Sequence, residues 1–141
     1  MVDQDLVLKK LAYIETCVQQ LRSLARLDDI ETDVREERFV VHTLQLAAQA
    51  ALDVASHVVS DQKLGEPATN RELFDLLHAA GWITSDCAQV MGRLAGFRNM
   101  VVHGYERVNL GIVKDVVRHR LTDLLAYCAA IRTASGRTQS L

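Results

Sequence analysis

The segment from Phe39 to Ser60, FVVHTLQLAAQAALDVASHVVS, constrains the fold of this chain more than any other. Ala, Val and Leu extend around nearly the whole circumference of a helix here, and neither Gly nor Pro interrupts them. A helix that is apolar almost all round must be buried on most sides. We therefore expect a helix over about residues 32–60 that lies at the centre of a bundle or in an interface between copies of the chain.

Two further segments have the apolar spacing of amphipathic helices. The first covers roughly residues 3–28, and its stripe consists of Leu6, Leu11, Ile14, Val18, Leu21, Leu24 and Leu27. The last starts at a candidate cap, Asn109, and its stripe consists of Leu110, Val113, Val117, Leu121, Leu124, Cys128 and Ile131. We expect one helix for each stripe.

Capping residues predict two more helices between these segments. Thr69 and Glu72 form a capping-box pattern before RELFDLLHAAG, and Gly81 is suited to end that short helix. Thr84 is a candidate cap for a fourth helix that continues to about Val102, close to Gly104. The loop DQKLGEP, which contains the only proline, separates the short helix from the long apolar one.

The chain is expected to be all-α and to form a single domain over residues 1–141. It has 141 residues, an ordinary length for one domain, and aromatic residues make up only 5%, which disfavours strands. The short connections predict an antiparallel bundle of about five helices, with a frayed tail from about residue 133.

The cysteines and the hydropathy predict a cytoplasmic protein. Cys17, Cys87 and Cys128 are odd in number and widely separated, which argues against a disulfide framework and fits a reducing compartment. The N-terminal residues MVDQDLVLKKLAYIE do not resemble a secretory signal. No apolar run reaches the ~18 residues of a membrane span, so we expect no membrane association.

The charges are distributed unevenly along the chain. Residues 1–92 contain 8 Lys/Arg and 15 Asp/Glu, whereas residues 93–141 contain 8 Lys/Arg and 3 Asp/Glu. Two interpretations remain open. The halves can form solvated faces of opposite sign, or the basic half can attract an anion such as a nucleic-acid backbone.

A narrow polar seam follows the otherwise apolar second helix. At ~100° per residue its members share one sector, and they are Arg38, His42, Gln45, Gln49, Asp53, Ser56, His57 and Ser60. The seam can be the solvent face of the helix, or it can line a cleft. In the second case Asp53 and His57, one turn apart, are able to pair. The same spacing can hold two metal ligands, but no further ligand has suggestive spacing, so we expect no metal.

The second polar feature is the segment FRNMVVHGY, Phe97 to Tyr105. Arg98 and His103 would be ~140° apart on a continuous helix. They converge more easily if the helix ends near Val102 and the chain turns at Gly104. Each residue also has an ordinary alternative: a surface ion pair for Arg98, a polar helix end for His103, and a packed aromatic for Tyr105.

This segment resembles the Arg-x4-His-x-Tyr motif of the HepT-like branch of the HEPN superfamily. The stretch LQLAAQAALDVASHVVS is similar to the long helix of these proteins, and the resemblance extends over about residues 5–132. It implies a HEPN-like helical fold and a metal-independent endoribonuclease with no cofactor. It also implies a homodimer whose motifs lie close to the interface.

The resemblance also implies a partner and a means of control. HepT-like proteins are toxins of toxin–antitoxin pairs, and their partner is an MntA-type nucleotidyltransferase that transfers AMP to the motif tyrosine, here Tyr105. Arg98 is then expected to bind the phosphate of the RNA substrate and His103 to transfer protons. Asn99 and Tyr105 are supporting candidates beside them, and Asp53 and His57 are supporting candidates in the seam. The alternative is a non-catalytic helical partner of a nucleotidyltransferase.

Overall fold

The computed structural model describes residues 3–103 and 108–139, and for His103 and Gln139 it describes the backbone alone. All regular elements of the described residues are helical. They are α1 (Gln4–Leu24), a 3₁₀ turn (Leu27–Asp29), α2 (Val34–Asp61), α3 (Asn70–Ala79), α4 (Ser85–His103), α5 (Leu110–His119) and α6 (Leu121–Gln139). The all-α prediction is confirmed.

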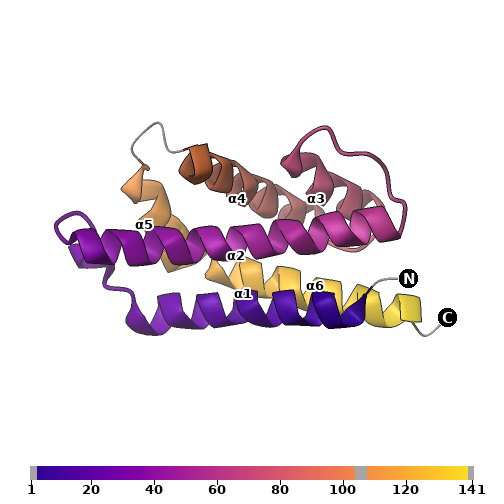
Figure 1. The fold of residues 1–141 in the computed structure, drawn as a ribbon, viewed down its shortest axis with the longest axis horizontal. Helices are drawn as coiled ribbons and strands as arrows, with labels where there is room; N and C mark the ends of the chain where they lie inside the picture. The colour runs from indigo at the N-terminus through magenta and orange to yellow at the C-terminus, as the bar shows by residue number, and fades with distance from the viewer. Residues whose placement is uncertain (1–2, 104–107, 140–141) are drawn as a thin grey trace.

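Helix α2 is the central element of the bundle, as its sequence predicts. It packs against α1, α3 and α4, and α1 packs in turn against α6 (Figure 1). Alanines along the buried sides of α2 have no long side chain, so neighbouring helices can approach its backbone closely. The buried residues of α2 are Val40, Thr43, Leu44, Ala47, Ala48, Ala50, Ala51, Leu52, Val54, Ala55, Val58 and Val59.

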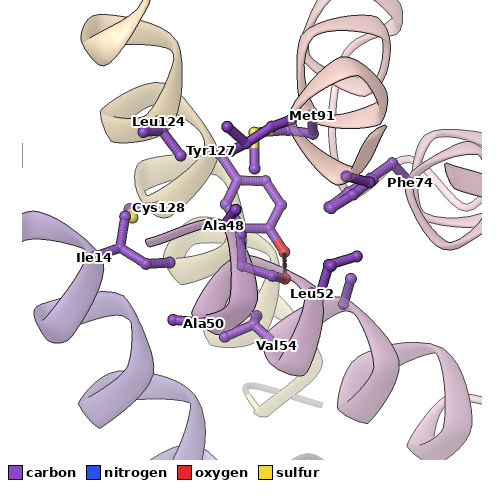
Figure 2. Packing of buried hydrophobic residues seen from close by; sticks show 14 of the residues in the cluster. Ile14, Ala48, Ala50, Leu52, Val54, Phe74, Met91, Leu124, Tyr127 and Cys128 are labelled. Atoms are coloured by element: carbon purple, nitrogen blue, oxygen red, sulfur yellow. Dashed lines mark hydrogen bonds between the residues drawn. The ribbon is translucent and has the colours of Figure 1, made fainter. Parts of the chain in front are cut away.

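Tyr127 of α6 anchors the core beside α2. Its ring is fully buried and meets Phe74 of α3 edge-on, with 5.8 Å between the ring centroids. Its hydroxyl donates a 2.9 Å hydrogen bond to the carbonyl oxygen of Ala51 (Figure 2). Because a buried hydroxyl without a partner is costly, this bond also specifies where α6 lies along α2.

The predicted helix caps are confirmed wherever the structure describes them. The side chains of Thr69, Thr84 and Asn109 each accept a hydrogen bond from a backbone N–H in the first turn of α3, α4 and α5. Gly81 has a positive φ of 79°. It ends α3 in a Schellman motif, in which Trp82 N–H donates to the carbonyl of Leu77 at 2.9 Å.

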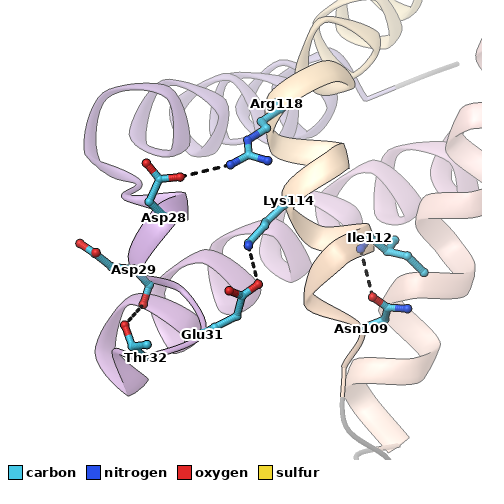
Figure 3. A network of polar contacts seen from close by, with 8 residues as sticks. All are labelled: Asp28, Asp29, Glu31, Thr32, Asn109, Ile112, Lys114 and Arg118. Carbon is cyan, nitrogen blue, oxygen red and sulfur yellow. Dashed lines mark hydrogen bonds and ion pairs between the residues drawn. The ribbon is translucent and has the colours of Figure 1, made fainter.

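The predicted fifth helix is two helices, so the described residues form six α-helices rather than about five. The apolar stripe starts beside Gly111, but neither Gly nor Pro occurs between Ile112 and Ile131, and no sequence signal indicates the break at Arg120. The break turns α5 toward the α1–α2 connection, where Lys114 pairs with Glu31 and Arg118 with Asp28 (Figure 3). Tertiary contacts therefore override a continuous helical pattern.

The tail expected to fray from about residue 133 is helical as far as Gln139. Ala134 and Ser135 are buried in this part of α6, which means that the described part of the tail packs on the bundle at these residues. Among the described residues, no helix combines the length and the hydropathy that crossing a bilayer requires.

The basic half of the sequence is partly neutralised by the acidic half. Arg132 of α6 forms two hydrogen bonds, of 2.7 and 2.6 Å, with the carboxylate of Glu15 on α1. The two ion pairs of α5 also join residues from opposite halves. The charge asymmetry of the sequence therefore becomes a set of contacts between helices.

Candidate active site

Helix α4 presents Arg98 toward α2. The helix buries Met91, Ala95 and Phe97, and this buried face sets its rotation. Arg98 consequently lies half-buried against the polar seam of α2 rather than on the open surface. The two helices are antiparallel, so residues further along α4 lie beside earlier residues of α2 (Figure 1).

The Arg98 guanidinium is held by two neutral side chains. Its Nε donates to Gln49 Oε1 at 2.6 Å, and its Nη1 donates to Asn99 Oδ1 at 3.1 Å. Within the described residues, no carboxylate lies at ion-pair distance from Arg98, and Nη2 has no partner. A half-buried, always-charged fork with an unused edge is suited to bind a phosphate.

Gln49 connects Arg98 to an ion pair between α1 and α2. Its Nε2 donates to Asp53 Oδ1 at 2.8 Å, while Asp53 Oδ2 accepts from Lys10 Nζ at 3.1 Å. An ionised carboxylate only accepts hydrogen bonds, so Asp53 must face the amino end of the Gln49 amide. The carbonyl end of the amide is then directed at Arg98. Asp53 thus reaches the motif through Gln49 and not directly.

Solvent exposure differs between the members of the polar seam. Arg38, His42, Ser56 and Ser60 are exposed, whereas Gln45, Gln49, Asp53 and His57 are half-buried. Neither interpretation from the sequence covers the whole seam: part of it is a solvent face, and its middle lies against α1 and α4.

His57 does not pair with Asp53, although the spacing allowed it. Its Nε2 accepts a 3.1 Å hydrogen bond from the backbone N–H of Asp3, at the start of α1. No described contact links His57 to Arg98. In the part of the chain that the structure describes, no three His, Cys, Asp or Glu side chains gather as a metal site would require.

The rest of the motif lies at the C-terminal end of α4. His103 is the last residue of the helix, one residue beyond the predicted end, and Asn99 is one turn earlier on the same face. Asn99 therefore stands between the Arg98 guanidinium and the position of His103. Tyr105 and the expected turn at Gly104 lie outside the described residues.

An open groove continues from Arg98 along α2 toward the N-terminus of that helix. It has a volume of about 320 Å³ and lies between α2, the end of α4 and the start of α5. Its lining residues are Glu37, Arg38, Val41, His42, Gln45, Val101 and Val108. Three members of the polar seam thus line a cleft next to the motif.

The cysteines do not supply a nucleophile at neutral pH. All three are free thiols. Burial raises the pKa of Cys87 to about 11, with a further contribution from Asp123, and burial raises the pKa of Cys128 to about 12. Burial also raises the pKa of Cys17. All three thiols are therefore disfavoured as thiolate nucleophiles.

Comparison with known proteins decides the family. Residues 13–131 match the family described as "Ribonuclease HepT-like". The chain belongs to this family. The enzyme class of this HepT-like chain is accordingly that of a ribonuclease, and the family expected from the Arg98–Tyr105 motif is confirmed.

Two curated relatives carry the HepT name. The mRNA nuclease HepT of Shewanella oneidensis is 30% identical over 129 residues, which cover 91% of this chain and 97% of that protein. The tRNA nuclease HepT of Aphanizomenon flos-aquae is 32% identical over 83 residues, which cover 59% of this chain and 56% of that protein.

A solved structure extends the similarity to three dimensions. It is the tri-AMPylated Shewanella oneidensis HEPN toxin in complex with an MNT antitoxin. That toxin chain is 30% identical to this HepT-like chain and superposes with a TM-score of 0.84, covering 92% of this chain and 98% of the toxin. The expected HEPN-like fold is confirmed.

Sequence reasoning placed Gln49 in the seam but gave it no role, and it did not consider Lys10. The available signal for Gln49 was its position one turn before Asp53, on the same face of α2. The partner on α4 could not be read from the sequence, because 49 residues separate Gln49 from Arg98.

Proposed function

We propose that this HepT-like chain is the toxin of a toxin–antitoxin pair and a metal-independent endoribonuclease that cleaves RNA through attack of the 2′-hydroxyl. The observation that carries the proposal is the Arg98 guanidinium, which Gln49 and Asn99 orient and whose Nη2 has no partner among the described residues. A cation held in this way is ready for an anionic ligand, whereas one already paired with a carboxylate is not.

The reaction requires no group beyond the RNA and the protein. The 2′-oxygen forms a bond to the adjacent phosphorus and loses its proton to a base, and the bond from phosphorus to the 5′-oxygen breaks. The leaving 5′-oxygen takes up a proton from an acid. The products are a 2′,3′-cyclic phosphate and a free 5′-hydroxyl. Arg98 stabilises the charge on the phosphate oxygens, and His103 transfers a proton, because imidazole exchanges protons near neutral pH.

A second copy of the chain can supply the second proton-transfer group. One imidazole cannot easily act as base and acid in the same step. A homodimer that brings two copies of the motif to one cleft provides two His103 side chains. We therefore propose a two-fold dimer with the motifs near its interface. We propose that Asn99 supports the site by its contact with Arg98, and Asp53 by its contact with Gln49. No described contact of His57 with Arg98 supports its proposed role.

The proposed partner is an MntA-type nucleotidyltransferase that transfers AMP to Tyr105. The support is the tri-AMPylated toxin in complex with its MNT antitoxin, which this chain resembles over 92% of its length. A phosphodiester on Tyr105, two residues from His103, would bring a negative charge close to the Arg98 region. It would compete there with the scissile phosphate of the RNA.

The two relatives act on different classes of RNA. One relative is an mRNA nuclease and the other a tRNA nuclease. The relative covered over nearly its whole length is the mRNA nuclease. We propose mRNA as the substrate class to be tested first.

Substitution of the two motif residues tests this function. Arg98→Ala and His103→Ala should each lower RNA cleavage by at least about 100-fold, as expected for groups that act on the transition state. Thermal stability should change little, and cleavage by the unchanged chain should persist in EDTA. Arg93→Ala, on the same helix but outside the motif, is the matched control and should retain activity.

The chemistry of the products provides an independent check. The new 3′ ends should carry a 2′,3′-cyclic phosphate, detectable by mass spectrometry of a short RNA. Products with a 5′-phosphate that appear only with Mg²⁺ would rule out the 2′-hydroxyl mechanism. Intact RNA combined with tight binding of the nucleotidyltransferase would favour the non-catalytic alternative.

A further inference from the structure

We infer that the groove between α2 and α4 is a nucleotide-binding subsite that holds the nucleotide of the RNA next to the cleaved phosphodiester. The inference rests on the proposed function and adds residues that the motif does not contain: Arg38, His42 and Gln45 of α2.

The position of the groove is the first argument. Arg98 contacts Gln49, and Val101, three residues later on α4, lines the groove beside Gln45 and Val41. Gln45 is one turn before Gln49 on the same face of α2. A single-stranded RNA whose phosphate contacts Arg98 can therefore continue into the groove without turning away from the protein.

The polar side chains of the groove are available for a ligand. Among the described residues, Arg38, His42 and Gln45 make no side-chain hydrogen bond or ion pair. Some other basic residues of the surface do have partners: Lys114 pairs with Glu31, Arg118 with Asp28 and Arg132 with Glu15. Arg22, Arg35 and Arg93 have none among the described residues, but they do not line the groove. The groove thus concentrates unused donors beside the motif.

The remaining lining matches the other parts of a nucleotide. Val41, Val101 and Val108 form an apolar floor that can lie against the face of a base. Glu37 also lines the groove, and its carboxylate accepts hydrogen bonds only. It would repel a phosphate but can accept from a ribose hydroxyl or an exocyclic amino group. Phosphate is therefore placed at Arg38 and His42, and the nucleoside toward Glu37.

The size of the groove agrees with this assignment. Its volume of about 320 Å³ lies at the lower end of the range, roughly 300–1,000 Å³, of pockets that hold small molecules. A single nucleotide is a small ligand of this kind, whereas a duplex would be far too wide to enter.

Binding of a short single-stranded RNA tests the subsite separately from catalysis. The measurement uses fluorescence anisotropy on the His103→Ala background, which prevents cleavage. Adding Arg38→Met should weaken binding about tenfold, the loss of one hydrogen bond to a charged group. The slope of log K against log salt should fall by about 0.7, the contribution of one phosphate of a single strand. Arg35→Met, also exposed on α2 but outside the groove, should change neither quantity.

Competition distinguishes a nucleotide site from a phosphate site. AMP should displace the RNA from the His103→Ala chain, and its competition should weaken when Arg38→Met is added. Inorganic phosphate should compete much less well at the same concentration. Equal competition by phosphate and AMP would contradict the nucleotide assignment.

The outcomes separate the two proposals. If Arg38→Met binds RNA with unchanged affinity and salt slope while Arg98→Ala still abolishes cleavage, the subsite is wrong and the ribonuclease mechanism stands. If the unchanged chain cleaves no RNA but Arg38→Met still weakens nucleotide binding relative to Arg35→Met, the subsite stands and the mechanism is wrong.

Discussion

Gln49 is a neutral residue whose position between two charged groups gives it a directed role. Asp53 accepts from one end of its amide, and the other end accepts from Arg98. A carboxylate in place of the amide would face Asp53 with like charge, and an aliphatic side chain would leave Arg98 Nε without this partner. An amide is therefore well suited to join an anionic and a cationic residue without neutralising the cation.

Gln49→Met should lower kcat/KM for RNA by roughly tenfold, because Arg98 loses a hydrogen bond that orients it. Asp53→Asn should lower activity less and leave the oligomer unchanged. Since Asp53 acts through Gln49, the double variant should be no worse than Gln49→Met alone. Gln20→Met, an exposed substitution on α1, serves as the control. Additive losses in the double variant would mean that Asp53 reaches the site by another route.

At the scale of elements, ion pairs between helices join parts of the chain that no local pattern connects. Arg132 of α6 holds Glu15 of α1 with a two-bond contact, and this contact lowers the pKa of Glu15 below its ordinary value. Both side chains remain more than a third exposed, at 37% and 39%. The pair is therefore expected to align α1 and α6 rather than to dominate stability.

The stabilisation from Glu15 should depend on pH in a defined direction. Its pKa is lower in the folded state, so the contribution is present above the ordinary value of 4.5 and is lost as the pH falls through the lower folded value. Arg132→Met should thus cost less than about 1 kcal/mol at pH 7. The difference from the unchanged chain should shrink below pH 4.5. Denaturant unfolding at several pH values, with Arg22→Met as control, measures this difference. A difference that is constant down to pH 3 would exclude the ionised pair as its cause.

At the scale of the whole molecule, the bundle brings the motif to the surface next to apolar side chains. Met100 and Val102 of α4 and Ile112 of α5 are 40%, 46% and 49% exposed. Exposed apolar residues beside a polar site are suited to contact another chain. This placement supports the proposed dimer with paired motifs.

Light scattering at micromolar concentration should give a mass near twice 15.7 kDa. A charge among the exposed apolar residues near the motif, Met100→Glu, should shift the chain toward a monomer. RNA cleavage should fall in parallel, because each site would lose its second His103. Leu24→Glu, at the exposed end of α1, provides a control for added charge. A monomer that retains full activity would remove the argument for a composite site.

Control by the partner can be tested on the complete pair of proteins. Co-expression with the proposed MntA-type nucleotidyltransferase should add ~329 Da per AMP to a peptide that contains Tyr105 and should abolish cleavage. Tyr105→Phe should prevent the mass increase and leave a toxin that the partner cannot silence by this route. Full neutralisation of the Phe variant without any mass change would instead indicate inhibition by binding.

Local patterns in the sequence were sufficient for much of this fold. The position of α2 at the centre, the caps Thr69, Thr84 and Asn109, and the end of α3 at Gly81 follow from periodicity and backbone preferences, which act over a few residues. The Arg98–Tyr105 motif was likewise recognisable because its residues are neighbours in the chain.

Contacts between distant residues required the folded molecule. The break at Arg120, the packed tail of α6 and the path from Lys10 through Asp53 and Gln49 to Arg98 join segments far apart in sequence. The break at Arg120 illustrates the physical reason. A continuous apolar stripe permits a straight helix, but burial and ion pairing of α5 against the α1–α2 connection favour a bent one. Periodicity specifies which face of a helix is buried, whereas the partner of that face depends on how all the helices pack together.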